Sequence, residues 1–282
     1  MRKAGLSFVL ANSLFLSLFA LSQSSPTPAW QAVEAALGRK GQLQADGVIK
    51  FGMPRSDLKV SVGTLSIRPT LALGAWVAFD SPGPDACLMG DLVLTGDEVA
   101  PVMARLQSGN IEITALHNHL LHESPQILYM HVFGHGDAAA LAKSVKAALS
   151  LTGTPSASAA SQSGDLGIDV SGIEQALGYK GRINGGVLQF SVPRSESISE
   201  EGKRIWNSMG IATALNFQPT GGGKAAVTGD FVLLAGEVNP VIRTLNHAHI
   251  AVTALHSHML DEAPRLFFLD RKSTRLNSSH RL

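Results

Sequence analysis

A pair of histidines separated by one residue occurs twice in this chain, in the same local sequence each time. The first copy reads TALHNH at residues 114–119, and the second reads TALHSH at residues 253–258. A glutamate and a proline follow each pair at the same distance, which gives His117, His119, Glu123 and Pro125 in the first copy and His256, His258, Glu262 and Pro264 in the second. Packing alone can keep leucine and alanine in register, but it does not require two histidines and a glutamate at fixed spacing. These two segments are therefore the place to look for chemistry.

The His-x-His spacing suits a metal ion if the pair lies on a β-strand. Residues i and i+2 of a strand point to the same face, about 6–7 Å apart, so that His117 and His119 project together. A catalytic zinc ion usually has three protein ligands and a water molecule. Glu123 and its counterpart Glu262 are candidates for a further ligand, and His131 is a candidate in the first copy only. With histidine ligands and no cluster of thiolates, zinc is the first choice among divalent metals.

Two functions are compatible with this pattern. In the first, a bound metal activates water for hydrolysis, and His122, Glu123 or His131 acts as the general base. In the second, the chain is a non-enzymatic module of the cell envelope that binds a small molecule or an envelope component in the cleft between its repeats. The histidines would then be structural, and would hydrogen-bond across the sheet or close the loop that contains Ser124 and Pro125.

Other motif assignments receive less support. His-x-His-x-x-x-Glu resembles the first metal motif of cupins, but the second cupin motif is absent and helices interrupt the all-β order that cupins require. An amidohydrolase would need eight β/α units, which the chain does not supply. The sequence contains neither a Gly-x-Ser-x-Gly elbow nor a P-loop, which disfavours serine hydrolases and nucleotide hydrolases.

The duplication extends over most of the chain. Residues 33–41, 54–56 and 90–94 are matched, at a nearly constant offset, by residues 173–181, 193–195 and 229–233. A period this long indicates tandem domains rather than a solenoid, whose repeats run about 20–50 residues. Residues 151–166 are rich in Ser, Ala, Gly and Thr without periodicity, as in a linker. The predicted domains are therefore residues 26–150 and residues 167–269.

Each repeat is expected to contain helices and strands in the same order. In the first repeat, residues 32–37 predict a short helix ended by Gly38, and residues 48–53 and 58–62 alternate like the strands of a hairpin. Further strands are predicted at residues 75–79, 87–94, 111–117 and 127–133, a helix at 97–106, a turn at 134–136, and a helix at 137–149 that Asp137 caps. This order predicts an α+β fold of two tandem repeats, each an antiparallel sheet with helices packed on one face.

Composition excludes several classes of protein. The formal net charge is +1 and no basic stripe is present, which argues against nucleic-acid binding. Cys87 is the only cysteine, so neither an intrachain disulfide nor a metal site built from several cysteines can form. Its apolar neighbours predict a buried, inert thiol.

The two ends of the chain differ from the repeats. Arg2 and Lys3 precede an apolar run over residues 6–21 that is shorter than the roughly 20 residues of a membrane span. This pattern predicts a signal peptide over residues 1–22, and hence an exported protein, periplasmic or secreted, with no stable membrane span after cleavage. Residues 270–280 read DRKSTRLNSSH and resemble the translation of a sequencing adapter. We expect residues 270–282 to be a non-native tail that truncates the second repeat.

The histidine-rich segment resembles a known family. The sequence TALHNHLLHESP at residues 114–125, followed by HVFGHGD at residues 131–137, is similar to the LppY/LpqO-type family of exported bacterial proteins, which are classed under a domain of unknown function. The resemblance covers both halves, and the histidine-rich segment is its most specific part. It implies a secreted or envelope-associated bacterial protein with duplicated domains and no settled activity. The family includes lipoproteins, whereas this chain has no cysteine near its predicted cleavage site.

Overall fold

The computed structural model describes residues 28–156 and 164–273 of the chain. The predicted signal peptide, the middle of the predicted linker and most of the predicted tail lie outside the described residues. The first repeat comprises η1 (Pro28–Trp30), α1 (Gln31–Leu37), β1 (Gln42–Leu43), β2 (Ile49–Pro54), β3 (Ser61–Val62), β4 (Leu65–Ser66), α2 (Pro69–Ala72), β5 (Gly74–Phe79), β6 (Ala86–Thr95), α3 (Gly96–Gln107), β7 (Glu112–His117), β8 (Glu123–Ser124), β9 (Ile127–Gly136) and α4 (Ala138–Leu149). The second comprises α5 (Val170–Leu177), β10 (Arg182–Asn184), β11 (Val187–Val192), β12 (Ile198–Glu200), β13 (Lys203–Ile205), η2 (Asn207–Met209), β14 (Thr213–Gly221), β15 (Lys224–Leu234), α6 (Ala235–His247), β16 (Ala251–His256) and β17 (Leu266–Ser273).

Each repeat is built on a six-stranded sheet with the same topology. The strand order is β1-β2-β5-β6-β9-β7 in the first repeat and β10-β11-β14-β15-β17-β16 in the second, and all neighbouring strands are antiparallel. The longest pairing of the first sheet joins β6 to β9, from Ala86 opposite Gly136 to Thr95 opposite Ile127. The predicted antiparallel α+β fold with tandem duplication is therefore confirmed.

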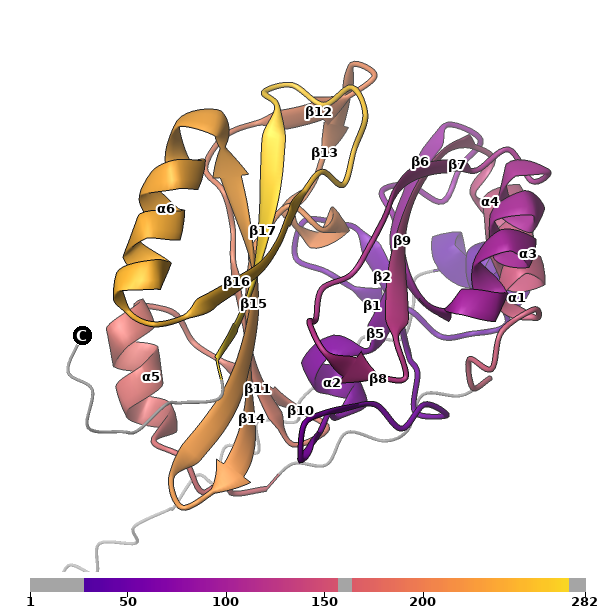
Figure 1. Cartoon of the computed structure of the whole chain (residues 1–282). Helices are drawn as coiled ribbons and strands as arrows, with labels where there is room; N and C mark the ends of the chain where they lie inside the picture. Colours follow the sequence, from indigo (N-terminus) through magenta and orange to yellow (C-terminus); the bar gives the residue numbers. More distant parts are fainter. Residues whose placement is uncertain (1–27, 157–163, 274–282) are drawn as a thin grey trace, which may run out of the picture.

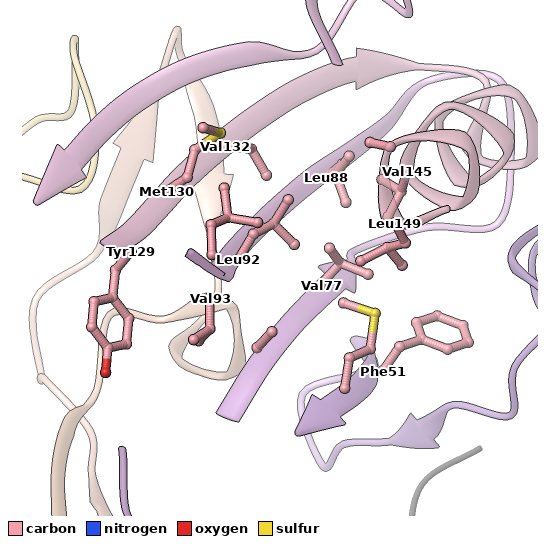
Figure 2. Packing of buried hydrophobic residues seen from close by; sticks show 14 of the residues in the cluster. Phe51, Val77, Leu88, Leu92, Val93, Tyr129, Met130, Val132, Val145 and Leu149 are labelled. Carbon is pink, nitrogen blue, oxygen red and sulfur yellow. The ribbon is translucent and has the colours of Figure 1, made fainter. Parts of the chain in front are cut away.

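Helices cover the outer face of each sheet. In the first repeat α1, α3 and α4 lie on one side of the strands, and in the second α5 and α6 lie on the corresponding side (Figure 1). Figure 2 shows Val145 and Leu149 of α4 facing Leu88 and Val77 of the sheet. Burial of these apolar side chains holds each helical layer on its sheet.

Local signals fix where these helices begin and end. Gly38 ends α1 in the left-handed conformation, at φ 76°, and Asp137 caps α4 by accepting a hydrogen bond from the Ala140 backbone N–H. Helix α3 begins with a capping box in which Glu98 binds the Thr95 backbone N–H. The predicted ends of these three helices agree with the structure to within a residue.

The inner faces of the two sheets pack against each other. Met89 and Phe133 of the first sheet share one buried apolar cluster with Val232 and Phe268 of the second. Figure 1 shows the resulting arrangement of four layers, with helices outside and both sheets inside. Strands such as β9 are consequently buried on both faces, and their sequences are almost continuously apolar.

Two expectations for the first repeat were wrong. Residues 48–53 and 58–62 do not form a hairpin, because β2 pairs with β1 and β5, whereas β3 pairs with β4 and β8. Residues 134–136 form no turn, because β9 continues to Gly136 and His135 lies opposite Cys87 in the sheet. Cys87 is buried as expected, and burial raises the pKa of its thiol to about 12.

The two repeats differ on their helical side. Within the described part of the second repeat, no helix takes the place that α4 has in the first. A groove lies there instead between α5 and α6, lined by Leu177, Leu215, Phe231 and Val241 among others. Among the helices of the described residues, none is long and apolar enough to cross a membrane.

Candidate metal centre

Three neighbouring strands of the first sheet carry polar side chains on its inner face. Asp91 of β6 lies opposite His131 of β9, and His117 of β7 lies opposite Tyr129, two residues before His131. The equivalent strands of the second sheet carry Asp230, Asp270 and His256, with Asp230 opposite Asp270 and His256 opposite Phe268. Because residues two apart on a strand share a face, the polar groups of each sheet point toward the other repeat.

Reciprocal hydrogen bonds lock the two histidine loops together. The Thr114 hydroxyl donates to the carbonyl oxygen of His258 at 2.6 Å, and the Thr253 hydroxyl donates to that of His119 at 2.8 Å. Thr114 and Thr253 occupy the same place in the two TALH segments. The two repeats are thus related by an approximate twofold exchange at this point, and each repeat helps to place the histidines of the other.

Five imidazoles meet at this interface, and we call them the histidine cluster: His117, His119, His131, His256 and His258. The ring of His117 lies 3.6 Å from that of His256, and the ring of His131 lies 3.6 Å from that of His258, measured between centroids. Both contacts join the first repeat to the second. The sequence-predicted histidines of the two copies, drawn from separate halves of the chain, therefore form a single cluster.

Three carboxyl groups border the histidine cluster. Oδ1 of Asp270 lies 2.5 Å from Nδ1 of His119, again across the interface. The Asp91 carboxyl lies 3.9 Å from Nε2 of His119 and 4.0 Å from Nε2 of His131. The Asp230 carboxyl lies 3.6 Å from Nε2 of His258.

Burial shifts the pKa values of four of these histidines and of the three aspartates in the direction that disfavours their charged forms. It lowers the pKa of His117 to about 3 and that of His256 to about 2, with a smaller contribution from the charge of His119. It also holds the pKa of His131 and His258 well below the usual range. In the opposite direction, burial raises the pKa of Asp91 to about 7 and raises those of Asp230 and Asp270. Neutral imidazole is the form that binds a metal ion.

Several buried polar atoms of this region have no hydrogen-bond partner among the residues that the structure describes. They are Nε2 of His117, Nε2 of His131, Nδ1 of His256, Oδ1 of Asp91, Oδ1 of Asp230 and Oδ2 of Asp270. A buried polar atom without a partner is destabilising, typically by about 1–3 kcal/mol. Six such atoms in one region indicate that another group belongs among them, and a cation suits a set of lone pairs and carboxyl groups.

The geometry allows a metal ion to be held in three ways. The groupings are His117, His131, His256 and His258; His117, His119, His256 and Asp270; and Asp91, His119 and His131. Within each grouping, the potential ligand atoms all lie within 4.8 Å of one another. All five histidines that the sequence predicts as metal ligands take part in at least one grouping.

The remaining predicted residues lie elsewhere. Glu123 accepts a hydrogen bond from the side chain of Asn118 and faces the Ile127 backbone N–H, and Glu262 accepts from the Leu266 backbone N–H and from Arg265. The shared glutamates therefore brace the loop after each histidine pair, and neither belongs to a metal grouping. His122 is exposed, with φ 62°, and is not in a grouping either.

Three aspartates of the site were missed from the sequence. Asp91 and Asp230 interrupt apolar strands at matching positions, Gly90-Asp91 and Gly229-Asp230, and this repeated charge in a buried strand was a usable signal. The preceding glycines have a packing role, because a Cβ on Gly90 would lie 2.8 Å from Val77. Asp270 falls in the segment that we expect to be a non-native tail. The chain nevertheless forms β17 through this residue, which takes the position that His131 has in β9, and the site is described for the sequence as it stands.

Comparison with known proteins agrees with the duplication. No curated protein and no solved structure matches the chain. A family model described as Domain of Unknown Function (DUF1259) matches residues 31–151 and again residues 171–275, once for each repeat. Since these two matches span most of the chain, the protein belongs to the DUF1259 family.

Proposed function

We propose that the protein binds a divalent metal ion between its two repeats, with zinc as the first candidate. The observation that carries the proposal is the grouping of His117, His131, His256 and His258, whose ligand atoms all lie within 4.8 Å of one another. Two of these histidines come from each repeat. Imidazole ligands without thiolates favour zinc among the common divalent ions.

A purely structural role explains the histidine cluster less well. Structural histidines in a buried site would be expected to satisfy their ring nitrogens with protein partners. Here Nε2 of His117 and Nε2 of His131 have none among the described residues. The nearby carboxyl groups are also buried without a full set of donors, which disfavours an interface designed only for packing.

The chemistry that such a centre supports best is metal-assisted hydrolysis. A bound divalent ion lowers the pKa of a coordinated water and polarises a carbonyl or phosphoryl oxygen. The carboxyl of Asp91 lies within 4.0 Å of two cluster histidines and so borders the centre, whereas the carboxylate of Glu123 is engaged by its own loop and is not available as the general base. A survey of ester and phosphoester substrates with zinc-loaded protein tests this step, and turnover that persists in metal-free protein would contradict it.

The cellular setting is part of the proposal. The basic residues and apolar run at the N-terminus support export to the periplasm or medium, and the histidine-rich segment supports membership of the LppY/LpqO-type branch. The substrate or ligand would then be a small molecule or a component of the cell envelope. N-terminal sequencing of protein recovered after expression tests the export step: retention of residues 1–22 would contradict it.

Metal content of the protein tests the central proposal. Protein purified without a histidine tag is dialysed against buffered zinc and analysed by mass spectrometry, alongside the double variant His117→Ala/His256→Ala. We expect at least one ion per chain in the unchanged protein and less than about 0.2 in the variant, because the variant lacks one histidine ligand from each repeat. The control is His247→Ala/His249→Ala, which removes an exposed His-x-His pair outside the cluster and should leave the content unchanged.

Two results would contradict the proposal. One is less than about 0.2 ion per chain in the unchanged, folded protein at micromolar free zinc. The other is an equal loss of metal in the control variant, which would place the ion on the exposed pair instead of the histidine cluster.

A further inference from the structure

The approximate twofold relation between the repeats extends to the groups that could hold a metal. His117 corresponds to His256 and His119 to His258, from the matched TALH segments. The sheet register adds a third correspondence: His131 lies opposite Ala115 and Asp91, as Asp270 lies opposite Ala254 and Asp230. His131 of the first repeat and Asp270 of the second therefore occupy equivalent positions.

Exchange of the two repeats converts one four-residue grouping into the other. The first set is His117, His131, His256 and His258, and the second set is His117, His119, His256 and Asp270. Both sets contain His117 and His256, which we call the central histidines. The first set adds His258 and, from the other repeat, His131 of β9. The second set adds His119 and, from the other repeat, Asp270 of β17. We propose that the interface holds two divalent metal ions, one in each set. The inference rests on the proposed function and specifies the number of ions.

The two ring nitrogens of His256 face different sets. Nε2 of His256 lies 2.9 Å from Nε2 of His258, in the first set, while Nδ1 lies 3.4 Å from Oδ2 of Asp270, in the second. If one central histidine serves each ion, each ion still has three protein ligands, and a catalytic zinc ion needs no more than three plus a water.

Asp91 is placed to join the two sets. Its Oδ2 lies 3.9 Å from Nε2 of His119, a member of the second set, and its Oδ1 lies 4.0 Å from Nε2 of His131, a member of the first. A carboxylate that presents one oxygen to each of two ligand sets has the arrangement of a bridge between two ions. Two-metal centres of this kind place the ions about 3.5–4 Å apart and clamp both oxygens of a displacement reaction.

The two positions differ in chemistry and in access. The first set has four imidazoles, whereas the second has a carboxylate, which is a harder ligand and accepts magnesium or manganese more readily. The side chain of His119 in the second set is 14% exposed, against 4% for His131 in the first. The second position is therefore expected to exchange its ion faster.

The test is a titration of the full, metal-stripped chain with cobalt(II), followed by its visible absorption and by mass spectrometry of the dialysed product. We expect two ions per chain in the unchanged protein, and one in each of His131→Ala and Asp270→Ala. Asp270→His should retain two, because it gives the second set the residue that His131 supplies in the first. Thermal unfolding of each variant reports whether it is folded.

The outcomes separate this inference from the proposed function. A saturating value of one ion in the unchanged protein, unaltered by Asp270→Ala, overturns the two-ion centre and leaves the single site intact. No bound ion at all overturns both. Two ions that both survive Asp270→Ala in a folded variant also contradict the inference, because the second set would then lack its defining ligand.

Discussion

Burial sets opposite protonation preferences for the two kinds of residue at the interface. It lowers the pKa of His117 to about 3 and raises that of Asp91 to about 7. In the absence of a metal, the folded protein therefore favours neutral imidazoles beside protonated carboxyl groups. A bound cation would favour the deprotonated carboxylates instead, so metal binding and proton release are coupled.

At the residue scale, this predicts how the stability of the metal-free protein depends on pH. The folded pKa of Asp91 is raised, so its contribution is fully present below the unfolded value of about 3.9 and is lost as the pH rises through 7. Asp230 and Asp270 shift in the same direction. The lowered pKa values of four cluster histidines (His117, His131, His256 and His258) oppose this only below about pH 6.5, where the unfolded chain takes up protons.

The metal-free protein should therefore lose stability between pH 6.5 and pH 8. Asp91→Asn removes one titrating group and should reduce that loss by about 1 kcal/mol. Urea denaturation of chelator-treated protein at the two pH values measures the difference, with Asp97→Asn on the exposed start of α3 as the control. Equal pH dependence in unchanged protein and Asp91→Asn would show that Asp91 titrates normally.

At the scale of the element, β17 departs from β9 after Leu269. In the first repeat, Val132 lies opposite Gly90 with 1% of its surface exposed, as part of the core under α4. The corresponding residue of β17 is Arg271, which lies opposite Gly229 and is only 9% exposed. Its Nε has no hydrogen-bond partner among the described residues, and burial lowers its pKa to about 10.

Arg271→Val should consequently stabilise the second repeat, by roughly 1–3 kcal/mol, because a buried charge without a full set of partners is replaced by the residue that the first repeat uses. Chemical denaturation at pH 7 measures the gain. The reciprocal variant Val132→Arg is the matched test and should destabilise the protein by at least as much. Destabilisation by Arg271→Val would mean that the arginine contributes a favourable interaction on this face.

The elements also show what local sequence can predict. Helices α1, α3 and α4 carry their own capping residues, and strands of six to ten residues such as β5, β6 and β9 carry a readable apolar pattern. Strands β3, β4 and β8 have two residues each, which is too short for a period, and they pair only through long-range contacts. The false hairpin at residues 48–62 follows from this limit.

At the scale of the whole molecule, the candidate ligands could be predicted from the sequence, but the contact between the two histidine pairs could not. Spacing identified His117 and His119 as a pair, and duplication identified His256 and His258, but nothing local indicated that the two pairs face each other. That arrangement depends on the inner faces of both sheets, where Phe133 and Phe268 are buried together. The nearly continuous apolar run of β9 was the available sign that this strand is covered on both sides.

The spacing of the shared glutamates does not by itself separate a chemical role from a structural one. Fixed spacing in two copies is equally expected for a loop that must close in the same way twice. Glu123 and Glu262 each face the backbone N–H four residues later, at Ile127 and Leu266, and so carry out that structural task. The contacts between the two repeats separate these explanations, and the sequence of one repeat alone does not show those contacts.

Anomalous X-ray diffraction at the zinc absorption edge would show whether histidines of both repeats build one metal centre. Crystals of tag-free protein loaded with zinc should give an anomalous peak between the two sheets, within about 2.0–2.1 Å of imidazole nitrogens from each repeat. Zinc-loaded crystals with no peak at the histidine cluster, or with a peak bound only by residues of one repeat, would rule out a centre shared by the two repeats.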